Sequence, residues 1–356
     1  MNSSNTMSKD DKKRLWIFIA MAYGLTLLMS IPMYIGYKRG IDIGVFPTAK
    51  MMYPACGVVL GILLTRKDIK SFPLAGYVLI LASTVLLMIL SLWSVFSEFK
   101  NADIIAEAVA CVFGLITYIV FWACGRDKQE RAGIRRKNIK KSILMIALFL
   151  VLYVINVIIT TYLTGLRDGD VTDQLAQLVD PFKKVKTWLL LFGIIISFPL
   201  SFIFFFGEEY GWRHYLQPIM QKKYGPIGGI LLLGVVWALW HLDVDLMYYT
   251  KECKIQMVIS QIITCVAYAI FFGYAYLKTQ NIWVPIIMHY LNNNLIAVLS
   301  EGDVSVLENQ VITWGDIPIQ LVTSIIFVVF IFSPVFRKKK ETIECVGNES
   351  INIENQ

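Results

Sequence analysis

Long apolar stretches separated by short polar loops recur along this chain of 356 residues. Residues 15–37, 72–96 and 143–163 are each long enough to cross a bilayer, which takes roughly 20 helical residues. They are too long and too uniformly apolar for the strands of a membrane barrel, whereas a helix satisfies its own backbone groups in lipid. The pattern therefore predicts an all-α, polytopic transmembrane bundle.

The same pattern predicts about ten spans and a division of the chain. The expected spans are residues 15–37, 44–65, 72–96, 102–124, 142–164, 187–221, 226–247, 255–277, 283–300 and 317–336. The most basic loop, residues 125–141, separates the first four spans from the last six. We therefore expect an N-terminal unit of unknown role (1–124), a second membrane unit (142–336) and a cytoplasmic tail (337–356).

Composition and charge agree with a membrane protein. Charged residues make up 17% of the chain, hydrophobic residues 56%, and mean hydropathy is +0.60, whereas soluble domains carry about 25% charge. The net charge of +7 comes from basic residues in short loops at helix ends, which argues against a nucleic-acid partner. With both termini in the cytoplasm, the inner loops hold more than twice as many Lys and Arg residues as the outer loops, as the positive-inside rule requires.

Ionisable side chains within a span are costly and mark functional sites by default. Three such stretches contain all three histidines of the chain. In the first, residues 205–214, Glu208 and Glu209 follow an aromatic run, and Glu209 can pair with Arg213 on the same helix face. Two glutamates at the end of a span are, taken alone, most simply explained as headgroup contacts.

The other two stretches place a histidine four residues from a second polar or aromatic group. Trp237 and His241 share one helix face, and so do His289 and Asn293. A single histidine on an aromatic face is usually a hydrogen-bonded core residue, and a His–Asn pair is a common contact between membrane helices.

The spacing brings the first two stretches to a common depth. The best turn signal between them is residues 222–226, with the sequence KKYGP. Glu208 lies 16 residues before Tyr224 and His241 lies 17 after it, which places each roughly 24 to 26 Å from the turn on antiparallel helices. This geometry requires the sixth span to remain helical through both glutamates.

Such a set of groups has two chemical uses. A carboxylate beside an imidazole can take a proton from water, and a second imidazole with an amide can donate hydrogen bonds to an oxyanion. Imidazole nitrogens and a carboxylate can also bind zinc, for which Glu208, His241 and His289 are the candidate ligands. The chain contains no HExxH motif, so the zinc interpretation lacks its strongest signature.

Together the three stretches resemble a known family, the CPBP intramembrane proteases. This family includes the CAAX prenyl protease 2 enzymes and the bacterial Abi and lysostaphin-resistance-like proteins. The resemblance covers about residues 142–336, and Trp237 stands where the family often has Phe. The motifs that carry it are Glu208-Glu209-x-x-x-Arg213, an aromatic-x-x-x-His ending at His241, and His289-x-x-x-Asn293.

The resemblance implies an endopeptidase that works through water activated by a glutamate. In that case Glu208 is the general base, His241 assists it, and His289 with Asn293 forms the oxyanion site. Glu209 and Arg213 are implied as supporting residues that fix the helix. No cofactor is required on this interpretation, although the family was long described as metal-dependent.

The expected partners are the lipid bilayer and a membrane-associated peptide or protein substrate, of CAAX type or a bacteriocin or leader peptide. Two other functions are compatible with the pattern: an immunity or regulatory protein of the same fold without catalysis, and a transporter. Complete motifs favour the enzyme over the first. Against the transporter, the two halves show no repeat and no matching pair of helices interrupted by Gly or Pro.

Overall fold

The computed structural model describes residues 7–97 and 101–337. Every regular element in these residues is a helix and none is a strand, which confirms the all-α prediction. Apart from Arg337, the tail predicted at 337–356 lies outside the described residues.

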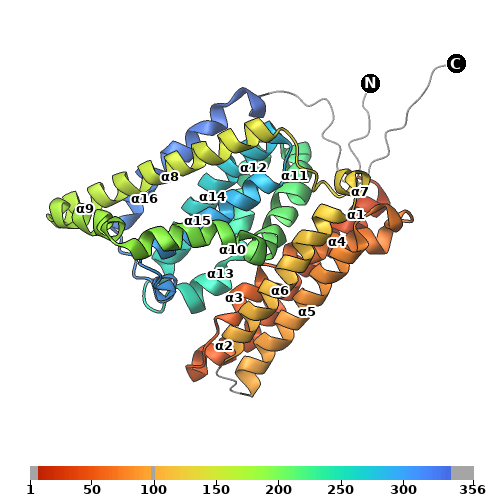
Figure 1. Ribbon diagram of the computed structural model, residues 1–356, viewed down its shortest axis with the longest axis horizontal. Coiled ribbons are helices and arrows are strands. Elements are labelled where there is room, and N and C mark those ends of the chain that lie inside the picture. Colours follow the sequence, from red (N-terminus) through yellow and green to blue (C-terminus); the bar gives the residue numbers. More distant parts are fainter. Residues whose placement is uncertain (1–6, 98–100, 338–356) are drawn as a thin grey trace.

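The N-terminal helices form one elongated bundle, coloured red to orange in Figure 1. The first two are continuous through a π-helical segment, η1 (Ala20–Gly24). A short helix, α7 (Arg126–Arg131), lies in the basic loop that follows the bundle. The helices of the bundle are α1 (Lys9–Ile19), α2 (Leu25–Arg39), α3 (Val45–Lys50), α4 (Tyr53–Thr65), α5 (Leu74–Phe96) and α6 (Ala102–Ala123).

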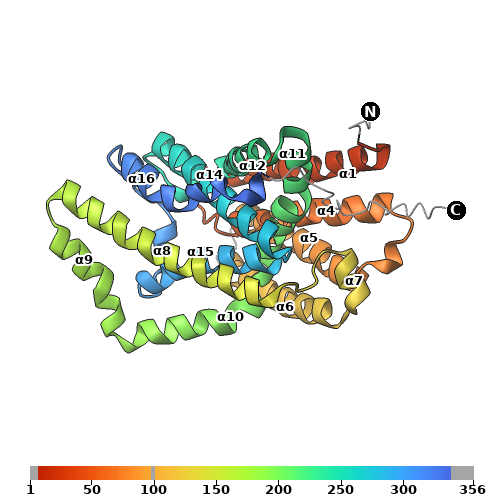
Figure 2. The same cartoon turned by 90° about the horizontal axis from the view of Figure 1, so that it is seen from above.

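The remaining helices form the other half of the molecule, coloured yellow-green to blue. Seen from above, α8, α9 and α10 outline its outer edge, and α9 lies at the end farthest from the N-terminal bundle (Figure 2). These helices are α8 (Ile139–Asp168), α9 (Val171–Val179), α10 (Val185–Glu209), α11 (Gln217–Tyr224), α12 (Pro226–Trp240), α13 (Leu242–Val244), α14 (Lys254–Thr279), α15 (Trp283–Leu299) and α16 (Asp316–Val328).

The prediction of ten spans was too high. The described residues contain seven helices long and apolar enough to cross a membrane, or eight if one bent pair, Pro226–Trp240 and Leu242–Tyr249, is a single span. The two predicted spans that fall short are represented by α15, with 17 residues, and by the short apolar helix Asp316–Phe332. At about 1.5 Å per residue, 17 residues reach about 26 Å, less than the roughly 30 Å of a hydrocarbon core.

The two halves share one hydrophobic core, in which Phe18 from α1 and Phe206 from α10 are both fully buried. Glycines let the backbones approach closely where α10 meets the start of α4. A Cβ on Gly207 would lie 2.3 Å from the carbonyl oxygen of Met51, and one on Gly211 would lie 2.3 Å from Pro54. The segment with both glutamates is therefore packed directly against the N-terminal bundle.

Candidate active site

The helix that carries the glutamates is continuous, as the spacing argument required. α10 ends at Glu209 and passes without a break into a π-helix, η4 (Tyr210–Leu216), and then into α11. π-Helical segments are rare in proteins as a whole, but those that occur often lie at functional sites. α11 ends at Tyr224, Gly225 has a φ of 78°, and α12 begins at Pro226, so the predicted turn is confirmed.

Glu208 is buried against α12, with 2% of its surface exposed. Its Oε2 atom accepts a hydrogen bond of 2.8 Å from the indole Nε1 of Trp237. Trp237, and not His241, is therefore the residue of α12 that lies level with Glu208. His241 follows one helical turn later, so the hairpin geometry holds with an offset of one turn.

His241 lies at a break in the chain, because α12 ends at Trp240 and the next segment is bent by 43°. The expectation of one continuous helix over 226–247 was therefore wrong. The Nδ1 atom of His241 is 2.9 Å from the carbonyl oxygen of Trp237, and its ring packs edge-on against Trp240 at 4.9 Å. Asp243 stabilises the bend, because its carboxylate accepts from the N–H of Val244 at 2.8 Å.

Glu209 has two partners and no exposed surface. Its Oε2 atom lies 3.2 Å from Nε of Arg213, as the i,i+4 spacing predicted. Its Oε1 atom lies 2.9 Å from Nδ1 of His289, a contact that the sequence did not predict. Glu209 therefore occupies one nitrogen of the His289 imidazole and leaves Nε2 as the nitrogen that can meet another group.

Asn293 lies one turn beyond His289 on α15 and is partly buried. Its Oδ1 atom accepts a hydrogen bond of 3.0 Å from Nδ2 of Asn292. Between Asn293 and the glutamates, the described part of the chain has no hydrogen bond. Of the residues predicted from the sequence, it is thus the one with the fewest contacts to the rest of the site.

One side chain touches most of the others. Besides donating to Glu208, Trp237 packs edge-on against His241 at 5.9 Å and against His289 at 5.6 Å. The guanidinium carbon of Arg213 lies over its ring, 4.5 Å from the centroid. The sequence marked Trp237 only as the aromatic partner of His241, and this spacing was the signal that it belongs to the site.

The residues named as zinc ligands do not form a metal-binding group. In residues 7–97 and 101–337, no three His, Cys, Asp or Glu side chains lie close enough together to hold a metal ion. Glu208 is bound to an indole, and His289 is bound to Glu209. The arrangement is instead one of proton acceptors and hydrogen-bond donors around a buried carboxylate.

Residues 185–295 match the family model of the type II CAAX prenyl endopeptidase Rce1-like proteins. This match supports the resemblance to the CPBP intramembrane proteases that the three motifs carry. The CPBP segment runs from the start of α10 into α15 and includes the four candidate catalytic residues, Glu208, His241, His289 and Asn293. No curated protein and no solved structure matches the chain. At the level of the family, the match supports a CAAX-type intramembrane protease, and the apolar helices support an integral membrane protein with several spans.

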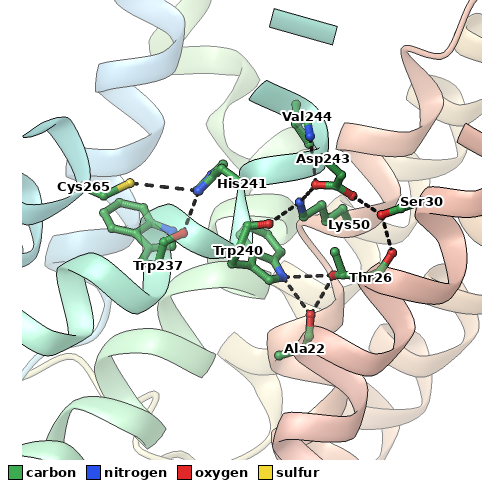
Figure 3. A network of polar contacts seen from close by, with 10 residues as sticks. All are labelled: Ala22, Thr26, Ser30, Lys50, Trp237, Trp240, His241, Asp243, Val244 and Cys265. Atoms are coloured by element: carbon green, nitrogen blue, oxygen red, sulfur yellow. Dashed lines mark hydrogen bonds and ion pairs between the residues drawn. The ribbon is translucent and has the colours of Figure 1, made fainter. Parts of the chain in front are cut away.

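Three charged residues next to the CPBP motifs were missed, and two of them, Lys50 and Asp243, are shown in Figure 3. Lys50 is only 4% exposed and pairs with Asp243 from the CPBP segment. Asp245, at the start of the π-helix η5 (Asp245–Tyr249), is 1% exposed, and neither carboxylate oxygen has a hydrogen-bond partner among the described residues. Two aspartates so soon after His241 in an apolar stretch were the available signal.

Proposed function

We propose that the protein is an intramembrane endopeptidase in which Glu208 activates the attacking water. The observation that carries the proposal is the position of this carboxylate. It is buried in a helix long and apolar enough to cross a membrane, accepts a hydrogen bond from the indole of Trp237, and shares that indole with two histidines. A carboxylate without an ion-pair partner in such surroundings is suited to accept a proton.

The reaction follows from these groups. Glu208 takes a proton from water while the water oxygen attacks the scissile carbonyl carbon. His289, carrying a proton on each ring nitrogen, donates Nδ1–H to Glu209 and Nε2–H to the oxyanion that forms. Asn293 donates to the same oxyanion through its amide N–H. The carbon–nitrogen bond then breaks, and the proton held by Glu208 passes to the leaving amine. His241 assists the proton transfer, while Glu209 and Arg213 hold the helix and His289 in place.

The substrate is a peptide or the terminal segment of a membrane-associated protein, of CAAX type or a bacteriocin or leader peptide. No cofactor takes part in this scheme. A chelator tests the zinc alternative directly, because activity lost on metal removal and restored by added zinc would replace the glutamate scheme with a metal-dependent one.

The decisive experiment compares two isosteric substitutions in protein reconstituted with candidate peptides. Glu208→Gln keeps the shape of the side chain but cannot take a proton, so cleavage should fall by at least about a hundredfold while peptide binding survives. Glu252→Gln, which changes an exposed glutamate, is the matched control and should cleave normally. Wild-type turnover by Glu208→Gln would refute the mechanism, and peptide binding by the wild type without cleavage would favour a regulatory protein.

A further inference from the structure

A buried ion pair joins the two halves of the molecule beside His241. Lys50 is the last residue of α3 in the N-terminal bundle, and Asp243 lies two residues after His241. The Lys50 ammonium pairs with the Asp243 carboxylate and also donates to the carbonyl oxygen of Trp240 (Figure 3). Ser30 adds a second contact from the bundle, because its hydroxyl donates to Oδ2 of Asp243 at 2.7 Å.

These contacts hold both sides of the bend that contains His241. Before the bend, the indole of Trp240 donates to the carbonyl oxygen of Ala22 at 2.8 Å and to Oγ1 of Thr26 at 3.1 Å. After the bend, Asp243 is held by Lys50 and Ser30. The side-chain nitrogen of His241 contacts its own helix, at the carbonyl oxygen of Trp237. The polar contacts that fix the flanking residues thus come from the N-terminal bundle.

Close packing sets the position of Lys50 relative to the glutamate helix. The next residue, Met51, places its carbonyl oxygen 2.3 Å from where a Cβ on Gly207 would lie. Gly207 directly precedes Glu208 in the sequence. The contact between Met51 and Gly207 therefore fixes where Lys50 stands relative to Glu208. Lys50 in turn contacts the His241 bend through Trp240 and Asp243.

Lys50 also supplies the positive charge that this buried region needs. Asp243 forms the ion pair with it, and Asp245, which has no hydrogen-bond partner among the described residues, interacts with it electrostatically. A charge inside a membrane protein is retained only when it is paired or functional. Removing Lys50 would leave two buried carboxylates next to the histidine without their counter-charge.

We propose that Lys50 is a positioning residue for His241, and that the N-terminal helices thereby complete the active site. This inference rests on the proposed function, in which His241 assists Glu208. Lys50 does not touch the substrate. It acts through the Trp240 carbonyl and the Asp243 carboxylate, which determine where the histidine ring stands in the chamber.

The test separates positioning from stability in the full-length, reconstituted protein. Lys50→Met should lower both thermal stability and kcat, because Asp243 is left unpaired. In Lys50→Met/Asp243→Asn the unpaired charge is gone, the new amide oxygen can still accept from the N–H of Val244, and the new amide NH2 can donate to the hydroxyl of Ser30. Thermal stability should therefore recover, while kcat stays about tenfold below wild type with KM unchanged, since the Trp240 carbonyl has lost its donor.

Tyr77→Phe is the matched control for a contact between the halves that lies away from the bend. It removes a hydrogen bond of 3.0 Å to the hydroxyl of Tyr210, which keeps its own bond to the carbonyl oxygen of Ala132. Its melting temperature should fall slightly at unchanged kcat. The proposal is overturned if kcat of the double variant recovers together with its stability. It is also overturned if kcat of Tyr77→Phe falls as much as kcat of the double variant, because Lys50 is then only structural.

A measurement without substrate keeps the inference separate from the proposed function. The rate at which diethyl pyrocarbonate modifies His241 can be followed by mass spectrometry of the peptide that contains it. We expect this rate to be several-fold higher in the double variant than in wild type or Tyr77→Phe. If Glu208→Gln cleaves normally, the proposed mechanism fails. The labelling rate then decides by itself whether Lys50 positions His241. An unchanged rate in the double variant would refute the positioning role.

Discussion

Trp237 and Lys50 differ in how far their partners lie along the chain. Trp237 binds Glu208 from the neighbouring arm of a hairpin, and the turn between those arms can be recognised from sequence. The Glu209–Arg213 pair is closer still, and its four-residue spacing made it predictable. Lys50 and Asp243 are separated by 193 positions, and no local pattern reports such a contact. The pair within one helix was therefore predicted, whereas the Trp237–Glu208 bond across the hairpin and the pair between the two halves were not.

The two adjacent glutamates should fail differently when changed. Glu209→Gln removes one partner of a fully buried ion pair and leaves Arg213 uncompensated, which costs about 3–5 kcal/mol. Glu208 has an indole as its hydrogen-bond partner, so Glu208→Gln should melt close to wild type. Arg213→Met should resemble Glu209→Gln, and combining those two substitutions should recover part of the loss. Thermal unfolding in detergent measures all four variants.

Activity does not separate these variants as cleanly as stability does. Glu209 also holds His289, so Glu209→Gln should lose turnover for an indirect reason. The opposite result would be a lowered melting temperature for Glu208→Gln, together with a Glu209→Gln protein that melts like wild type but fails to cleave. That result would exchange the two roles and make Glu209 the base.

At the scale of the helices, the length of an apolar run predicted well where a helix lies, but it did not predict whether that helix is continuous. The runs that became α5, α6 and α14 were recognised because each is uniformly apolar over 22 or more residues. The bend after α12 was missed because α12 is just as apolar up to Trp240. At the bend, the Asp243 carboxylate accepts from the N–H of Val244 and pairs with a cation that comes from another helix.

A pair of glycines on α10 tests how tightly α4 determines this helix. Gly207→Ala would place a methyl group 2.3 Å from the Met51 carbonyl oxygen, and because that atom is backbone it cannot rotate away. We expect a loss of about 1–3 kcal/mol, as for other overpacked sites. Gly193→Ala on the same helix meets nothing within 4 Å and should be neutral or stabilising by up to about 1 kcal/mol. Melting temperatures in detergent give the comparison.

Equal stabilities for the two alanine variants would mean that α4 can move away from α10 at little cost. In that case the close approach would not fix Lys50 relative to Glu208. A large loss confined to Gly207→Ala would instead identify the contact between α4 and α10 as part of the framework of the site.

For the whole molecule, the sequence predicted two units, and the fold joins them through one core. The CPBP match begins at residue 185, so it covers neither the N-terminal helices nor α8. Their contribution becomes visible only in three dimensions, where Met51 lies on Gly207 and Lys50 lies beside the His241 bend.

The orientation in the membrane is the remaining prediction. Four candidate spans precede the basic loop 125–141, so we expect that loop on the same side as the N-terminus, and its Lys and Arg residues predict that this side is the cytoplasm. Lys128→Cys, at an exposed position in a protein otherwise free of cysteine, should react with a membrane-impermeant maleimide only from the cytoplasmic face. Labelling from the outer face would overturn the orientation.

The same labelling at Arg337, also exposed, determines whether an odd or an even number of helices cross after the loop. Three helices there are long enough beyond question, and the bent pair around His241 is a fourth. Three crossings would put Arg337→Cys on the opposite side from Lys128→Cys, whereas four crossings, or the six expected from the sequence, would put both on one side. We expect the same side, because the bent pair then carries His241 to the depth of Glu208 and continues across the membrane. Reaction of the two cysteines from opposite faces would mean that an odd number of the helices after the loop cross.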